Sequence, residues 1–89
     1  MSMNSQYQQT NRIGQFTVSR QAVEDAPWKL SRVFSGFVPK VVDYDLATDS
    51  LCYMGWSPWF IPLDEGHDVP EYLYKITEDG VVIWQRKDA

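Results

Sequence analysis

Cysteine and histidine are almost absent from this chain of 89 residues, which has Cys52 and His67 as the sole residue of each kind. A single cysteine excludes an intramolecular disulfide, and one cysteine with one histidine is too few to hold a structural zinc ion. Glycine is also scarce, and no Gly-rich phosphate-binding loop occurs. We therefore expect a fold that needs neither a disulfide nor a cofactor, in a reducing, cytoplasmic compartment.

Long hydrophobic runs are missing as well. No apolar stretch approaches the roughly 20 residues that a transmembrane helix requires, so we expect no membrane partner. The segment Met1–Gln15 has no basic patch followed by an apolar run, which argues against a signal peptide. Residues 1–11 are rich in Gln, Asn and Ser and offer little to bury, so we predict a disordered tail there and a single domain over residues 12–89.

Basic residues are rare in the second half of the chain. Residues 43–79 contain nine Asp and Glu residues against Lys75 alone, whereas residues 12–40 contain five Lys and Arg residues against two acidic ones. Phosphate binding needs clustered Lys and Arg, so nucleic acid is not an expected partner of the acidic half. An acidic, solvated face that keeps an aromatic-rich protein in solution is the simpler interpretation of the net charge of −4.

Apolar and aromatic side chains, by contrast, are abundant: hydrophobic residues make up 44% of the chain and aromatic residues 15%. The densest stretch is Cys52–Leu63, which contains Trp56, Trp59 and Phe60 together with two prolines. Aromatic rings bury large apolar areas, and the prolines stiffen the backbone that presents them. This segment can therefore anchor either the core or a partner.

One stretch has the periodicity of an amphipathic helix. Its apolar residues recur at steps of three and four: Ala22, Val23, Ala26, Leu30, Val33, Phe34 and Phe37. Asp25 as the N-cap would place Pro27 in the first turn, where a missing N–H costs nothing, and Gly36 is suited to end the helix. Residues 19–24 are the candidate for a separate short turn of helix.

Alternating apolar residues predict the strands. Gln15–Val18 is a short candidate strand. The segments Val38–Leu46 and Leu51–Trp56 predict a β-hairpin around the turn residues 47–50. A second hairpin flanks Asp79-Gly80, a dipeptide typical of tight hairpin turns. Together these segments predict an α+β domain, with one amphipathic helix packed on an antiparallel sheet of four to five strands built from two β-hairpins.

A two-residue turn at Asp79-Gly80 would fix the register of the second hairpin. Thr77 then faces Val82, and Lys75 faces Trp84 as an exposed cation–aromatic pair. In this register the core face carries Tyr72, Tyr74, Ile76, Val81 and Ile83. The opposite face carries Leu73, Lys75, Thr77, Val82, Trp84 and Arg86.

No catalytic or metal motif stands out. His67 lies in the acidic segment 64–68, but the spacing of its neighbours matches no calcium or zinc loop, so a solvated turn is favoured. Cys52 alternates within a predicted strand, with no strained turn or oxyanion donors beside it, and is better interpreted as a small buried side chain. We therefore expect a protein that is not an enzyme and has no cofactor.

Two functional hypotheses remain. The first is a protein-interaction module that binds a protein partner or itself through an aromatic sheet face, most simply as a homodimer. That face would carry Trp84, Val82, Leu73, Trp56, Met54 and Cys52. The second is a small-molecule binding domain with an aromatic pocket between helix and sheet. The pocket would be lined by Trp59, Phe60, Tyr72 and Tyr74.

Overall fold

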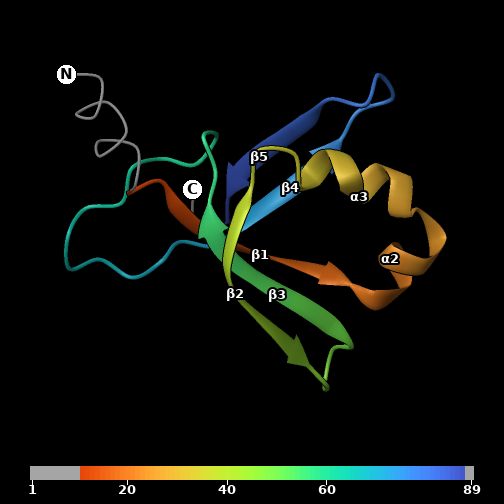
Figure 1. Cartoon of the computed structure of the whole chain (residues 1–89), viewed down its shortest axis with the longest axis horizontal. Helices are drawn as coiled ribbons and strands as arrows, with labels where there is room; N and C mark the ends of the chain where they lie inside the picture. The colour runs from red at the N-terminus through yellow and green to blue at the C-terminus, as the bar shows by residue number, and fades with distance from the viewer. Residues whose placement is uncertain (1–10, 88–89) are drawn as a thin grey trace.

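The computed structural model describes residues 11–87, which form five strands and two short helices (Figure 1). In chain order the elements are β1 (Ile13–Ser19), α2 (Arg20–Asp25), α3 (Pro27–Val33), β2 (Val38–Asp45), β3 (Ser50–Trp56), β4 (Tyr72–Ile76) and β5 (Val82–Arg86). The predicted α+β class is confirmed. The disordered tail predicted for residues 1–11 lies outside the described residues except for Asn11, whose carbonyl accepts a hydrogen bond from the Leu63 N–H.

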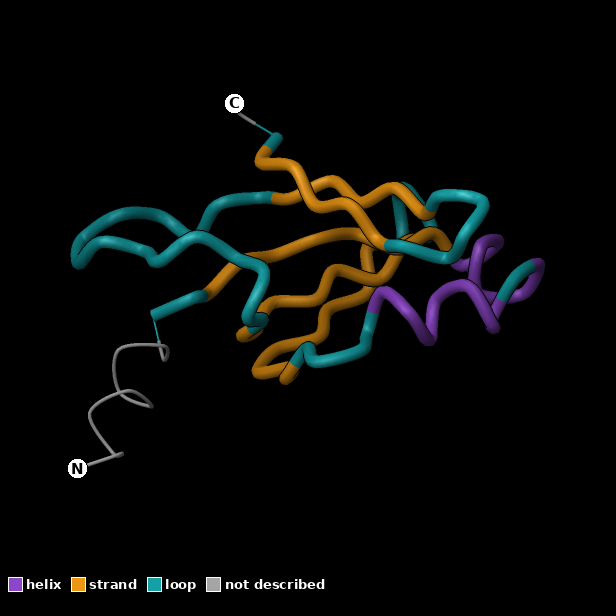
Figure 2. Tube along the Cα trace, turned by 90° about the horizontal axis from the view of Figure 1, so that it is seen from above, coloured by secondary structure: helices purple, strands orange, loops and turns teal. Residues whose placement is uncertain are grey.

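The strands form two sheets instead of the predicted single sheet of four to five strands. The first sheet is antiparallel with the order β1-β3-β2, and the second is the antiparallel hairpin β4-β5. One parallel bridge between Gln15 and Glu71 joins them, where the Gln15 N–H donates to the Pro70 carbonyl. Within residues 11–87 no further bridge joins β1 to β4, and α3 also contacts β4. Figure 2 shows the helices at one end of the molecule and the long loop before β4 at the other.

The predicted single helix is wrong, because the chain forms two helices that meet at Ala26. Ser19 caps α2 by accepting a hydrogen bond from the Ala22 N–H, so the separate turn considered for residues 19–24 is present. Ala26 has φ −146° and ψ 62°, and Pro27 follows as the first residue of α3. Proline disfavours the helical conformation in the residue before it, so the break falls at Ala26, and Asp25 closes α2 where we expected it to cap α3.

The first hairpin matches the sequence prediction. β2 and β3 pair from Val38 opposite Trp56 to Asp45 opposite Ser50, with one irregularity between Pro39 and Val41 that leaves Lys40 as a bulge. β2 lies at the edge of its sheet, and all eight of its residues are exposed.

The register predicted for the second hairpin is wrong by one residue. Ile76, and not Thr77, lies opposite Val82, and the Thr77 N–H donates to the Val81 carbonyl at 2.9 Å. The turn therefore has three residues, Glu78–Gly80, with Gly80 at φ +84°. Three-residue hairpin loops commonly place glycine in this left-handed conformation.

This shift exchanges the two faces of β5. Val82 and Trp84 now point towards the core, and Ile83 is exposed. Lys75 lies opposite Ile83, while Trp84 lies opposite Tyr74, so the expected Lys75–Trp84 pair does not form. The ring of Trp84 instead packs edge-on against Phe16, 5.1 Å between ring centroids.

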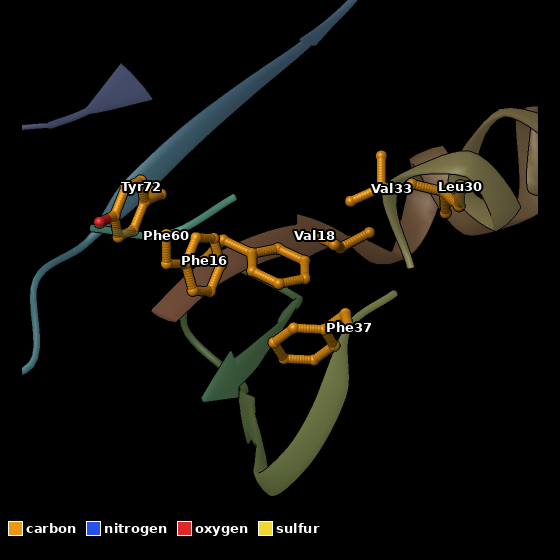
Figure 3. Close-up of a cluster of buried hydrophobic side chains, with 7 residues drawn as sticks. All are labelled: Phe16, Val18, Leu30, Val33, Phe37, Phe60 and Tyr72. Atoms are coloured by element: carbon orange, nitrogen blue, oxygen red, sulfur yellow. The ribbon is translucent and has the colours of Figure 1, made fainter. Parts of the chain in front are cut away.

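The core lies between the inner faces of the two sheets and α3 (Figure 3). Its buried hydrophobic residues are Phe16, Val18, Leu30, Val33, Phe37, Phe60 and Tyr72. Phe60 stacks on Tyr72 with 4.3 Å between ring centroids, close to Gly14, where a Cβ would meet the Tyr72 ring at 2.6 Å. The loop after β3 thus completes the core that the strands leave open.

Replacing Gly80 with valine should destabilise the protein, because a β-branched residue resists positive φ and its Cβ would lie 2.9 Å from Cζ of Arg32. Strain of this kind costs about 1–3 kcal/mol. Gly66→Val is the matched control, since Gly66 also has φ +84° but no atom within 4 Å of its Cβ position. Urea midpoints should fall for both variants and further for Gly80→Val, and an unchanged Gly80→Val midpoint would contradict this turn geometry.

Candidate functional site

The aromatic residues predicted to form a binding site are divided between the core and the surface. Phe60 and Tyr72 are buried and stacked, and the Tyr72 hydroxyl accepts a hydrogen bond from the Ile61 N–H. Trp84 is half-buried against them, with ring centroids 5.2 Å apart for Phe60 and Trp84. Of the four residues predicted to line a pocket between helix and sheet, Phe60 and Tyr72 thus fill the core by packing on each other, whereas Trp59 is exposed. Tyr74 is half-buried and lines a small hollow between the helices and β4.

The face predicted for homodimerisation is also divided. Trp84 and Val82 belong to the inner, core-facing side of their sheet. Leu73 is exposed on the outer side of β4. Cys52, Met54 and Trp56 alternate with the core-facing Tyr53 along β3, and are half-buried. The part of the predicted aromatic face that stays together is therefore the group on β3, Cys52, Met54 and Trp56.

On the outer side of the three-stranded sheet, residues of β2 lie beside this group on β3. Trp56 lies between Ile13 on one side and Val38 on the other, and Met54 lies opposite Val41. We call the apolar group formed by Val38, Val41, Met54 and Trp56 the outer patch. Val38 and Val41 are exposed, so the patch is accessible along its β2 side.

Among the five described strands, β2 is the one in which every residue is exposed. Val42 and Tyr44, on the side opposite to the outer patch, are exposed too, so both faces of this strand are open. Pro39 and the bulge at Lys40 interrupt the first half of the strand, and such features commonly protect edges from unwanted pairing. The second half, Val41–Asp45, pairs regularly with β3 and presents an uninterrupted edge.

Sequence reasoning predicts residues 38–46 as a strand of a hairpin but does not identify this strand as an edge. Pro39 and Lys40 within the strand were the signal that could have identified it, since proline and lysine are typical of edge strands. The exposed Trp28 at the start of α3 was likewise not singled out.

A polar cluster closes the far end of the same hairpin. The Tyr44 hydroxyl donates to the Asp49 carboxylate, and Nε of Arg20 lies 2.8 Å from its other oxygen. The hydrogen bond from Tyr44, and then the contact with Arg20, lower the pKa of Asp49, while the same hydrogen bond raises the pKa of Tyr44. All three groups are at the surface, so the cluster fixes the turn and contributes little to overall stability.

Replacing Tyr44 with phenylalanine should raise the pKa of Asp49 towards its ordinary value, because the main hydrogen bond that stabilises the carboxylate is lost. Because the pKa of Asp49 is lowered in the folded protein, its contribution to the free energy of unfolding is lost as the pH falls through that pKa. Because the pKa of Tyr44 is raised, its contribution is lost as the pH rises through that pKa. Carboxyl ¹³C NMR titration of both proteins tests this, and an identical Asp49 midpoint would contradict the assigned contact.

The candidate catalytic and metal-binding residues are Cys52, in β3, and His67, in the loop before β4. Sγ of Cys52 lies 3.7 Å from Oε1 of Gln15, and burial raises the pKa of its thiol, which disfavours the nucleophilic thiolate. His67 is exposed in a turn in which its N–H donates to the Asp64 carbonyl. Within residues 11–87, no three His, Cys, Asp or Glu side chains gather as a metal site. None of the helices in this range is long and apolar enough to cross a membrane.

Comparison with known proteins found no match: no protein-family model, no curated protein and no solved structure matches this chain.

Proposed function

We propose that this chain is a small, non-enzymatic protein-interaction module that binds a partner strand along the free edge of β2. The observation that carries the proposal is that all eight residues of this edge strand are exposed, with apolar side chains on both faces. An extended segment that pairs with such an edge gains main-chain hydrogen bonds, and its alternate side chains contact the residues on the two faces of β2.

The β2 edge is favoured over the edge at β5 for two reasons. β2 has eight residues against five in β5, and in β5 half-buried core residues alternate with exposed ones. A strand added at β2 would also extend the outer patch, so that Val38 and Val41 are covered at the same time. Covering apolar surface contributes about 25 cal/mol for each Å² removed from water.

The charges on β2 favour a basic partner segment. Asp43 and Asp45 alternate with the exposed Val42 and Tyr44, and both carboxylates lie on the same side of the strand as Val41. Lys or Arg side chains at alternate positions of an added strand would face them, and such cross-strand pairs contribute about 0.2–1 kcal/mol each. The arrangement therefore favours an extended segment that is apolar where it faces the valines and Tyr44 of β2 and basic where it faces Asp43 and Asp45.

Site-specific photocrosslinking tests this proposal in the native host. A photoreactive phenylalanine derivative at Val42 should capture a partner, because this side chain would lie beside the added strand. Ile83 is the matched control, since it is also β-branched, lies on an edge strand of the second sheet, β5, and is similarly exposed, 51% against 48% for Val42. Equal crosslinking at the two positions, or crosslinking at Ile83 alone, would contradict the proposal.

Charge reversal gives an independent check. The variant Asp43→Lys should keep its unfolding midpoint, because this side chain is exposed, but should weaken the crosslink from Val42. Asp45 is left unchanged, because its Oδ1 accepts a hydrogen bond from the Ala47 N–H in the turn. A crosslinked product with the mass of two copies would identify the partner as the chain itself, and a heavier or lighter product would identify a different protein. A crosslink unaffected by the charge reversal would show that the partner does not lie along this edge.

A further inference from the structure

A second surface, separate from β2, has the composition of a small ligand site. A hollow of about 350 Å³ lies between the end of α3, the loop after β3 and the β4–β5 turn. Its lining residues are Arg32, Ser35, Trp59, Gly80, Val81 and Val82. We infer that this hollow binds a carboxylate carried by a flat, apolar group, with the carboxylate on Arg32 and the flat group on Trp59.

Trp59 is held in place although its own side chain is 67% exposed. Its neighbours Ser57 and Phe60 are both buried. The Trp59 N–H donates to Oγ of Ser57 at 3.2 Å, and the Phe60 N–H donates to the Ser57 carbonyl at 3.1 Å. Two buried anchors thus fix the backbone that presents this ring, so a ligand that stacks on it has to order the side chain but not the loop.

Arg32 is positioned by the turn that follows β4. Its Nη1 lies 3.5 Å from the Gly80 carbonyl, and the guanidinium packs so closely on Gly80 that a Cβ there would meet Cζ at 2.9 Å. Among residues 11–87 no carboxylate is paired with Arg32. Glu78 and Asp79 belong to the same turn, but neither lines the hollow. The remaining donors of the guanidinium are therefore available to a ligand.

The chemistry of the lining specifies the ligand class. Among the described residues, the charged side chain in the lining is Arg32, whose planar fork matches a carboxylate, and the hydroxyl of Ser35 adds a further donor. Trp59, Val81 and Val82 supply an aromatic face and aliphatic walls. A cavity of this size lies at the lower end of the range for small-molecule sites. This inference does not depend on the β2 edge, which shares none of these residues.

Indole-3-propionate is a suitable probe, and its neutral amide, indole-3-propionamide, is the control for the charge. In ¹H–¹⁵N NMR titrations of the full chain, the carboxylate should shift the Trp59 indole N–H and the Gly80 and Val81 amides with a Kd of about 1 mM, a value typical of a ligand of this size. The amide should bind about tenfold more weakly, since it cannot form the charge-assisted pair with Arg32. Equal binding of the two compounds, or no shifts at these positions, would overturn the inference.

Two variants locate the site, and two controls match them. Trp59→Ala and Arg32→Gln should each weaken binding of indole-3-propionate about tenfold. Trp28→Ala and Lys29→Gln should leave it unchanged, because these residues form an exposed cation–aromatic pair outside the hollow, with Nζ 5.2 Å from the ring centroid. All four side chains are exposed, and the amide spectrum of each variant reports whether it folds. Binding that survives both site variants, or is lost in both controls, would contradict the assignment.

Discussion

Replacing Phe16 with alanine should produce the largest loss of stability of any single core truncation in this chain, about 3–5 kcal/mol. Phe16 is 2% exposed, and its ring has more aromatic neighbours than any other described residue. They are Phe34, Phe37, Tyr53, Tyr74 and Trp84, with centroids 5.0–6.1 Å away. These neighbours come from both sheets and the segment after α3, so the cavity would open at the point where all three meet.

The free energy of unfolding of typical proteins is about 5–15 kcal/mol, so a loss of this size would remove much of the stability of so small a domain. Urea unfolding followed by tryptophan fluorescence measures it. Trp28→Ala is the matched control, because it truncates an even larger ring that is 64% exposed, and it should change the free energy of unfolding by less than about 0.5 kcal/mol. Similar losses for the two variants would contradict the placement of the core at Phe16.

Replacing Gly55 with alanine should be nearly as damaging, although it adds one methyl group. Gly55 is buried in β3, and a Cβ there would collide with the Val38 carbonyl oxygen of the neighbouring strand and lie 2.9 Å from both Cζ of Phe37 and Cα of Pro39. Backbone atoms cannot rotate away from the added methyl, so the pairing of β2 with β3 must shift. Overpacking typically costs about 1–3 kcal/mol, and contact with backbone places this site at or above the upper end.

Gly66→Ala separates steric conflict from backbone preference. Gly66 has φ +84°, which disfavours alanine, but no atom lies within 4 Å of its Cβ position. The free energy of unfolding of this variant should fall by about 1 kcal/mol, because alanine disfavours this backbone conformation. A Gly55→Ala variant as stable as Gly66→Ala would show that β2 and β3 do not approach each other as closely as described here.

The positions of the hairpins could be predicted from the sequence, because turn residues interrupt clear alternation at both. Their register was harder to predict. Asp79-Gly80 fits both a two-residue turn and the last two residues of a three-residue turn, and the choice depends on whether Thr77 pairs with Val81. That choice reverses the two faces of β5, which is why Trp84 was placed at the surface and is found in the core.

The helix prediction was partly right. Pro27 indicated that a helix begins beside it, and the separate turn considered for residues 19–24 corresponds to α2. The expected N-cap was wrong, because the residue directly before the proline, Ala26, is the one that avoids the helical conformation, and Asp25 is the last residue of α2.

The candidate site was predicted least well, because composition does not separate aromatic residues that fill the core from those that face a partner. Phe60 and Trp59 are adjacent in the same loop, yet the first is buried and the second is exposed. The burial of Phe60 depends in part on Gly14, which leaves space for the rings of Phe60 and Tyr72, a contact between residues far apart in the sequence.

The free outer edge of β2 is the feature on which the proposed function depends, and amide hydrogen exchange of the dilute, isolated protein tests it most directly. In Val41–Asp45 successive N–H groups point to opposite sides of the strand, so the amides bonded to β3 should be protected while the alternate ones exchange as fast as those of an exposed loop. Adding the partner that crosslinking identifies should then slow the exchange of these fast-exchanging amides. Protection of all five amides in the dilute protein would contradict a free edge.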